Sequence, residues 1–204
     1  MKILIYVLLA AGAYLLGSVS ASIILSGRES GGDIRKYGSG NAGATNMARV
    51  YGMKSGLLTL GVDAGKALIS VFIGWLVAKD MGIAVTGIAC LLGHCFPAYY
   101  HFKGGKGVSV GAALGLAVDW RAFLIIVCVF FIFALTSKKV SLGSICAAVA
   151  LTIAAILLHV STPRLVLAVV ATVLVVFQHR SNIKRLLNGT EGDFKPASKG
   201  TVQK

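Results

Sequence analysis

The chain has 204 residues, of which 56% are hydrophobic and 13% are charged, and its net charge is +13 at pH 7. A soluble domain carries about a quarter charged residues, so the deficit excludes a predominantly soluble fold and leaves no room for a separate soluble domain. In so apolar a chain, cytoplasmic loop charge and anionic phosphate ligands explain the positive charge better than a nucleic acid does, and we expect no nucleic-acid partner.

Seven apolar segments follow one another along the chain, and about 20 apolar residues span a bilayer as a helix. The first is longer than the apolar part of a typical signal peptide, so we interpret it as a retained helix. The fourth is short and begins in a glycine-rich stretch, a feature that often marks a site in membrane proteins. The segments lie at roughly 3–25, 57–79, 83–99, 107–119, 121–137, 142–160 and 164–178.

This pattern predicts an all-α integral membrane protein, a bundle of seven transmembrane helices. We expect residues 1–191 to form one domain and residues 192–204 a polar tail, with the chain frayed from Asn188 onward.

Lysine and arginine are unevenly divided between the two predicted sides of the membrane. Seven spans place the termini on opposite sides, and four of these residues (Lys2, Lys79, Arg121, Arg164) fall on the N-terminal side, while Lys66 falls within a span. The positive-inside rule therefore predicts an external N-terminus and a cytoplasmic C-terminus. The fifteen residues on the cytoplasmic side are Arg28, Arg35, Lys36, Arg49, Lys54, Lys103, Lys106, Lys138, Lys139, Arg180, Lys184, Arg185, Lys195, Lys199 and Lys204.

The first polar segment is a glycine-rich string, Gly38-Ser-Gly-Asn-Ala-Gly-Ala-Thr-Asn46. Glycines let successive backbone N–H groups face one point, which makes an anion-binding nest. The string also fits the dinucleotide pattern G-x-G-x-x-G, with Asp63 about 20 residues further on, but that fold needs a preceding strand. An ordinary surface loop is the other alternative. The donors predicted to hold a phosphate here are Ser39, Asn41, Thr45 and Asn46, with Arg49 about one helical turn further on.

The second polar segment runs from Gly93-His-Cys-Phe-Pro97 to Phe102-Lys-Gly-Gly-Lys-Gly-Val108. Lys106 is flanked by glycines, so it can approach a phosphate without obstruction by neighbouring side chains. The string Gly107-Val-Ser-Val-Gly111 fits the nucleophile-elbow pattern, but that elbow needs a strand–turn–helix context. For His94, inside an apolar span, a hydrogen-bonded structural role is favoured over a catalytic one.

The third element is split between Ser141-Leu-Gly-Ser144 and the stretch from His179 to Glu191. On a helix, His179 and Asn182 share a face and could place a polyol hydroxyl beside a phosphate. A basic juxtamembrane stretch that binds lipid headgroups is the alternative. Asp63 and Lys66 are spaced as an ion pair within the second span, and a structural and a functional role stay equally open.

Together these segments resemble the bacterial acyl-phosphate-dependent glycerol-3-phosphate acyltransferases, the PlsY family. The matching strings are GSGNAGATN at 38–46, GHCFP and FKGGKGV within 93–108, SLGS at 141–144 and HRSNIKRLLNGTE at 179–191. The resemblance implies a seven-helix enzyme of the bacterial inner membrane with its active site near the cytoplasmic face. It implies acyl-phosphate as donor, glycerol 3-phosphate as acceptor, and lysophosphatidic acid and phosphate as products.

The resemblance also implies roles for single residues. Ser39, Gly40, Asn41, Thr45, Asn46 and Lys106 match the pocket for the donor phosphate. Arg49, Ser144, His179 and Asn182 match the acceptor site, and Gly104, Gly105, Ser141 and Glu191 belong to the same motifs and are predicted to bind substrate.

An acyl-phosphate is already activated, so the reaction needs alignment of two anions and stabilisation of the departing phosphate, and no covalent nucleophile. Either His179 or a substrate phosphate takes the proton of the acceptor hydroxyl. The H-x-x-x-x-D motif of other glycerolipid acyltransferases is absent from the sequence, and we expect no cofactor and no metal. A membrane transporter for a phosphorylated anion is the alternative, although such proteins are often built from repeats, and no repeat is evident.

Overall fold

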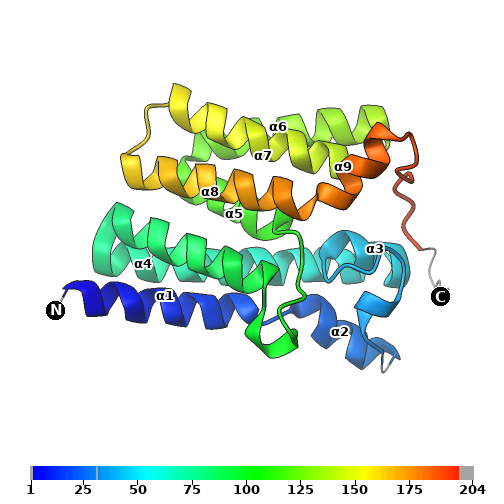
Figure 1. The fold of residues 1–204 in the computed structure, drawn as a ribbon, viewed down its shortest axis with the longest axis horizontal. Helices are drawn as coiled ribbons and strands as arrows, with labels where there is room; N and C mark the ends of the chain where they lie inside the picture. Colours follow the sequence, from blue (N-terminus) through cyan, green and yellow to red (C-terminus); the bar gives the residue numbers. More distant parts are fainter. Residues whose placement is uncertain (1, 31, 198–204) are drawn as a thin grey trace.

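The computed structural model describes residues 2–30 and 32–197, and within them it is built from helices joined by loops (Figure 1). The helices are α1 (Lys2–Ser18), α2 (Ala21–Ser30), η1 (Ile34–Lys36), α3 (Ala44–Tyr51), α4 (Met53–Cys95), η2 (Ala98–Tyr100), α5 (Val108–Val118), α6 (Trp120–Ser137), α7 (Val140–Leu157), α8 (Thr162–Gln178) and α9 (Arg180–Leu187).

Helix α4 contains two of the predicted apolar segments. Its helical geometry is interrupted at Ala78 and Lys79, where Lys79 has φ 49°, and the chain turns back so that its two arms, 53–77 and 80–95, lie side by side (Figure 1). The arms meet at Gly74 and Gly82, and a Cβ on Gly82 would lie 1.8 Å from the Gly74 carbonyl oxygen. Glycine is therefore required where the two backbones touch.

The first predicted segment is also interrupted. Instead of one helix over 3–25, the structure has α1 and α2 with a break at Val19 and Ser20. The break has a physical cause: the Val19 carbonyl accepts a hydrogen bond of 2.7 Å from the buried Lys66 ammonium of α4. A strong side-chain donor thus replaces a helical partner.

The surface of the bundle is apolar over most of its length. Large hydrophobic side chains such as Ile3, Leu8, Phe72, Trp120 and Leu135 are 57–80% exposed, far more apolar surface than a soluble monomer presents. By length and composition, four helical stretches of the described chain are able to cross a membrane, or five if the bent pair α8–α9 counts as one span. The protein is an integral membrane protein, and the count of seven spans stays a prediction.

The core lies where α4, α5 and α8 meet. Leu91, Leu114 and Leu167, one from each helix, are fully buried in one cluster. Helix α5 is only 11 residues long, too short to span a bilayer, and it ends inside the bundle between longer neighbours. A second, smaller cluster of Ile34, Ala42, Met47 and Val50 fixes the segment between α2 and α4.

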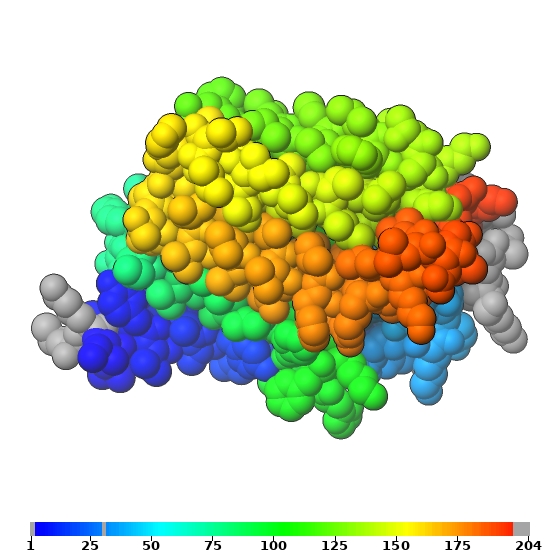
Figure 2. All heavy atoms as spheres, turned by 45° about the horizontal axis from the view of Figure 1, so that its top comes forward, coloured from blue at the N-terminus to red at the C-terminus, as the bar shows by residue number. Residues whose placement is uncertain are grey.

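The two chain ends lie at opposite ends of the bundle (Figure 1). The polar tail was expected to fray, but residues 192–197 are held by hydrogen bonds: Phe194 N–H donates to Lys138 O at 3.0 Å, and Ala197 N–H donates to Ala48 O at 3.1 Å. Figure 2 shows α9 and the residues after it beside the α3 region at this end. Fraying of the tail stays a prediction, and residues 198–204 lie outside the described chain.

Candidate active site

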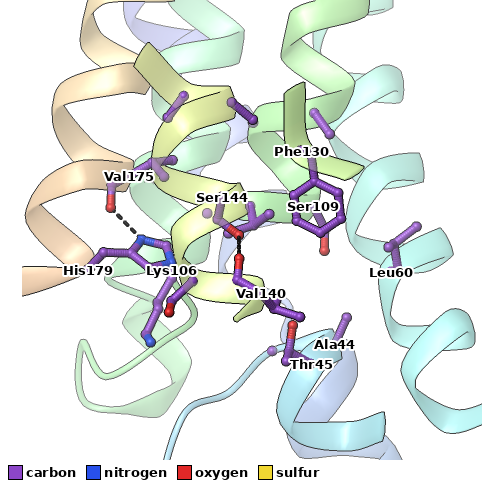
Figure 3. A pocket seen from close by; sticks show the side chains of 18 of the residues that line it. Ala44, Thr45, Leu60, Lys106, Ser109, Phe130, Val140, Ser144, Val175 and His179 are labelled. Atoms are coloured by element: carbon purple, nitrogen blue, oxygen red, sulfur yellow. Dashed lines mark hydrogen bonds between the residues drawn. The ribbon is translucent and has the colours of Figure 1, made fainter. Parts of the chain in front are cut away.

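A cavity of about 950 Å³ lies between α4, α5, α6, α7 and α8 and reaches the end of the bundle that carries α3 and α9 (Figure 3). Most of the predicted site residues line it, although they come from segments far apart in sequence. They are Ser39, Asn41, Thr45, Asn46, Arg49, Lys106, Ser141, Ser144, His179, Asn182 and Glu191. Gly40, Gly104 and Gly105 are not among the lining residues, so their contact with substrate stays a prediction.

A hydrogen-bond network centred on Glu191 forms the polar end of the cavity. Lys106 Nζ donates to Asn182 Oδ1, and Asn182 Nδ2 donates to Glu191 Oε1 at 2.6 Å. Ser141 Oγ donates to the same carboxylate oxygen at 2.5 Å, and Arg185 Nε contacts Oε2 at 2.6 Å. These contacts fix the loop before α5, helix α7, helix α9 and the segment after α9 relative to one another.

The same contacts keep Glu191 ionised. Burial works against the charged carboxylate, but the hydrogen bonds from Ser141 and Asn182 and the ion pair with Arg185 together hold the pKa of Glu191 below its usual value. Both carboxylate oxygens of Glu191 thus accept from protein donors, which makes Glu191 an organiser of the site.

Arg185 also lines the cavity, and sequence reasoning missed it. Its place six residues before Glu191, in the stretch interpreted as a basic binding segment, was the available signal. With Lys106 and Arg49, it gives this end three cations beside two carboxylates, Glu191 and Asp193, an excess of positive charge suited to an anionic ligand.

Burial weakens the charge on Lys106. The pKa of Lys106 is lowered to about 8: burial has the largest effect, the nearby cations Arg185 and Arg49 act in the same direction, and Glu191 opposes them. The ammonium is therefore charged at neutral pH but poorly solvated. An arriving phosphate would supply the counter-charge that the protein does not fully provide.

His179 lies at the break between α8 and α9, which are bent by 59°, and Figure 3 shows it next to Lys106. His179 Nδ1 is 2.7 Å from the Val175 carbonyl oxygen. A carbonyl only accepts, so Nδ1 carries the proton and Nε2 is left as an acceptor. The pKa of His179 is lowered to about 4, chiefly by burial and also by the nearby Lys106 charge, while the contacts with Val175 and Glu191 act in the opposite direction. His179 is thus neutral at pH 7 and can accept a hydroxyl proton in a hydrogen bond.

Asn46 lines the cavity, and its side chain also holds the loop together. Its side chain is 2% exposed; Oδ1 accepts from Ser39 N–H at 2.8 Å, and Nδ2 donates to the carbonyls of Ile34, Tyr37 and Asn41 at 3.0–3.2 Å. All of its polar atoms are therefore used within the loop. Asn46 shapes the nest, and Ser39, Asn41 and Thr45 line the cavity.

The loop around Asn46 takes the backbone shape that its glycines predicted. Gly38 and Gly40 have φ values of 55° and 72°, a conformation that side chains other than glycine rarely adopt. A Cβ on Gly38 would also lie 2.4 Å from Asn46 Oδ1. The two glycines thus wrap the backbone around the Asn46 amide.

Ser144 lies on α7, where its hydroxyl donates to the Val140 carbonyl at 2.9 Å (Figure 3). Its proton is engaged, so its oxygen is available as an acceptor facing the cavity. Ser109, the centre of the nucleophile-elbow pattern, also lines the cavity. It lies in the first turn of α5 after a loop, which is not the strand–turn–helix setting that the elbow needs.

The remainder of the cavity is apolar and continues from the polar end toward the middle of the bundle. Its walls include Leu60, Leu68, Leu116 and Phe131, and these four side chains are 38–53% exposed. The apolar half therefore reaches the outer surface of the bundle beside α4 and α6. One continuous volume thus has a cationic end and an apolar half open to the membrane.

Fold and site define a helical membrane protein that is built to hold a ligand with an anionic head and an apolar chain. A family model described as glycerol-3-phosphate acyltransferase matches residues 7–189. A relative of the same name from Finegoldia magna is 37% identical over 196 residues, covering 94% of this chain and 97% of the relative. The chain therefore belongs to the glycerol-3-phosphate acyltransferase family.

Solved structures agree with this assignment. Crystal structures of PlsY, an integral membrane glycerol 3-phosphate acyltransferase, superpose on this chain. The glycerol 3-phosphate form has a TM-score of 0.88 at 34% identity and covers 93% of this chain and 96% of that one. The lysophosphatidic acid form has a TM-score of 0.86 at 33% identity, covering 93% and 95%. The resemblance to the PlsY family is confirmed.

Proposed function

We propose that this protein transfers a fatty acyl group from acyl-phosphate to glycerol 3-phosphate, giving lysophosphatidic acid and inorganic phosphate. The observation that carries the proposal is the continuity of the cavity: its polar end suits two phosphates and its apolar half suits an acyl chain. In acyl-phosphate the phosphate is joined directly to the acyl carbon. Its phosphate would therefore lie in the polar end of the cavity and its acyl chain in the adjoining apolar half.

The donor phosphate is assigned to the nest of Ser39, Asn41 and Thr45, with Lys106 beside it. When the acceptor oxygen attacks the acyl carbon, the bond between that carbon and the phosphate oxygen breaks, and negative charge grows on the departing phosphate. A poorly solvated cation stabilises such charge strongly because few water molecules compete with it. The low pKa of Lys106 supports this role.

The acceptor is assigned to Arg49, Ser144, His179 and Asn182. A guanidinium suits the phosphate of glycerol 3-phosphate, and the serine oxygen and imidazole Nε2 suit its hydroxyl groups. With a pKa of about 4, His179 is a weak base, so it orients the attacking hydroxyl. An oxygen of the departing phosphate is then the better acceptor for the hydroxyl proton.

We further propose seven membrane spans with the N-terminus outside and the C-terminus in the cytoplasm of a bacterial cell, in the inner membrane. The support is the excess of Lys and Arg at the end of the bundle that carries the site. The active site then faces the cytoplasm, where phosphorylated metabolites are made.

The test is to incubate purified protein in detergent or vesicles with acyl-phosphate and labelled glycerol 3-phosphate. Formation of labelled lysophosphatidic acid and release of one phosphate per acyl transfer are expected. Uptake of label into sealed vesicles without acylation would identify a transporter for a phosphorylated anion instead. Acyl-coenzyme A offered in place of acyl-phosphate serves as the control for the donor, and it should give no product.

A further inference from the structure

Three ionisable side chains of α4 lie buried together; one of them, His94, lines the cavity, and the proposed reaction gives a role to none of them. Asp63, Lys66 and His94 are 1%, 5% and 6% exposed. Lys66 Nζ lies 2.8 Å from Asp63 Oδ1 and 3.2 Å from His94 Nδ1, and His94 Nδ1 is 3.6 Å from Asp63 Oδ1. Ionisable groups within a membrane protein are costly, so a cluster of three calls for a specific role.

Lys66 determines how the His94 ring is held. The Lys66 ammonium donates to the Val19 carbonyl at 2.7 Å and faces His94 Nδ1 at 3.2 Å, and it forms an ion pair with Asp63 Oδ1. Toward the ring the ammonium can only donate, so His94 Nδ1 is the acceptor and Nε2 carries the ring proton. The triad of Asp63, Lys66 and His94 thereby joins both arms of α4 to the break between α1 and α2.

His94 also supports the loop that precedes Lys106, through its backbone carbonyl and through the Nε2 side of its ring. Gly105 N–H donates to the His94 carbonyl at 3.1 Å. A Cβ on Gly105 would lie 2.3 Å from His94 Nε2 and 2.7 Å from the Ala42 carbonyl oxygen. A Cβ on Gly104 would lie 2.1 Å from the His94 carbonyl oxygen. Neither glycine has a positive φ, so close packing on His94 is what requires glycine at both positions.

We propose that the triad of Asp63, Lys66 and His94 is a positioning unit for Lys106. Asp63 and Lys66 fix the His94 ring, the ring and its carbonyl fix Gly104 and Gly105, and the next residue is Lys106. The ammonium of Lys106 is thereby held toward Asn182 and toward the place that the proposed function gives to the donor phosphate. An apolar residue at position 94 could fill the space but would lack the hydrogen bond that fixes the ring.

Two substitutions of His94 test the Nδ1 side and the Nε2 side of its ring separately. Asparagine ends its side chain at the depth of Nδ1, so His94→Asn keeps an acceptor for Lys66 and leaves a gap against Gly105. Glutamine reaches the depth of Nε2, so His94→Gln refills that gap. We expect His94→Asn to lower kcat by roughly tenfold to a hundredfold, because a shift of about 1 Å in a catalytic group has that effect. His94→Gln fills the gap but has no acceptor for Lys66 at the depth of Nδ1, so it should recover only part of the lost kcat.

Matched measurements exclude a merely structural role. The melting temperature of His94→Asn in detergent should stay near that of the wild type, and so should the KM for glycerol 3-phosphate. His101→Asn makes the same change at an exposed position of the same loop and should leave kcat unchanged. If kcat of His94→Asn falls only in proportion to the folded fraction, the triad is a structural ion cluster and the proposal is wrong.

A double-mutant cycle tests whether His94 acts through Lys106. In a Lys106→Ala background, His94→Asn should lower kcat by less than twofold further, because the group that it positions is already gone. A further fall as large as in the wild-type background would overturn the proposal.

A second readout needs no turnover. The pH dependence of Lys106 acetylation by a small reagent, followed by mass spectrometry, should have its midpoint near pH 8 in the wild type and move upward in His94→Asn as the ammonium gains solvent. An unchanged midpoint contradicts the proposal. A wild-type protein that forms no lysophosphatidic acid refutes the proposed function, and the labelling then decides the inference alone.

Discussion

Lys106 donates a hydrogen bond to Asn182 across 76 positions of the sequence, from the loop before α5 to helix α9. Lys106 belongs to the half of the site assigned to the donor, and Asn182 to the half assigned to the acceptor. This hydrogen bond joins the two halves of the site. A substitution that removes it in one half is therefore expected to affect the other half as well.

Lys106→Ala should lower kcat by roughly 10²–10³-fold, the usual effect of losing a group that stabilises transition-state charge. The protein should still fold, since Lys106 is only partly buried. Lys103→Ala, which removes an exposed lysine of the same loop, is the control and should keep wild-type kcat. Retention of more than half the wild-type rate by Lys106→Ala would show that this lysine is not a catalytic contact.

The lowered pKa of Lys106 predicts a basic limb in the pH profile. Lys106 is charged below its pKa of about 8 and neutral above it, so kcat/KM, which reports the free enzyme, should fall as the pH rises through about 8. Bound phosphates favour the charged form, and the limb in kcat should lie at higher pH. Lys106→Arg stays charged and should lose the limb in both. A limb that persists in Lys106→Arg belongs to another group.

Asn182→Ala should raise the KM for glycerol 3-phosphate more than that for the donor, and it should also lower kcat because Lys106 loses its partner. Asn188→Ala, at an exposed position just after α9, should change neither constant. A rise confined to the donor KM would mean that the two halves of the site are assigned the wrong way round.

His179→Ala distinguishes orientation from proton removal. If His179 only orients the acceptor, its loss raises the acceptor KM. The wild type then shows no acidic limb near the ordinary histidine pKa of 6.5, since burial lowers the pKa of His179 to about 4. A steep acidic limb near pH 6.5 that disappears in His179→Ala would identify this histidine as the general base.

Asn46→Ala should act first on stability. It removes the acceptor of Ser39 N–H and leaves three loop carbonyls without their donor, which is expected to cost about 1–3 kcal/mol of unfolding free energy. The donor KM should rise as the nest loses its shape. Asn41→Ala removes only bonds to Ser39 that are exposed and should leave the melting temperature nearly unchanged. An Asn46→Ala protein of wild-type stability with a raised donor KM would instead mark Asn46 as a direct ligand.

Topology is testable with single cysteines in a cysteine-free variant. Positions 28, 81, 162 and 190 are exposed, and they lie outside the predicted spans. An impermeant thiol reagent added to intact cells should label positions 81 and 162 and leave positions 28 and 190 unlabelled until the cells are opened. Labelling of position 28 in intact cells would reverse the proposed orientation.

Much of this architecture could be predicted from the sequence, because a bilayer requires long apolar helices and leaves a plain pattern. The polar segments could also be identified, since clustered glycines and cations in an apolar chain have few roles other than ligand binding. The break at Val19 could not be predicted, because its cause is Lys66, a residue of another helix. The use of every polar atom of Asn46 within its own loop could not be predicted either, nor could the bond between Arg185 and Glu191, since both depend on the exact path of a loop, which residue types do not determine.

The cavity carries its cationic end and its apolar half in one volume that reaches the side of the bundle, so the proposed reaction takes place at a phase boundary. The phosphates can come and go through water while the hydrocarbon chain stays in oil-like surroundings throughout. Moving a chain of a dozen methylene groups through water would cost roughly 10 kcal/mol, at about 0.8 kcal/mol per group. A lipid product made in this way needs no carrier, because it is already in the membrane that will use it.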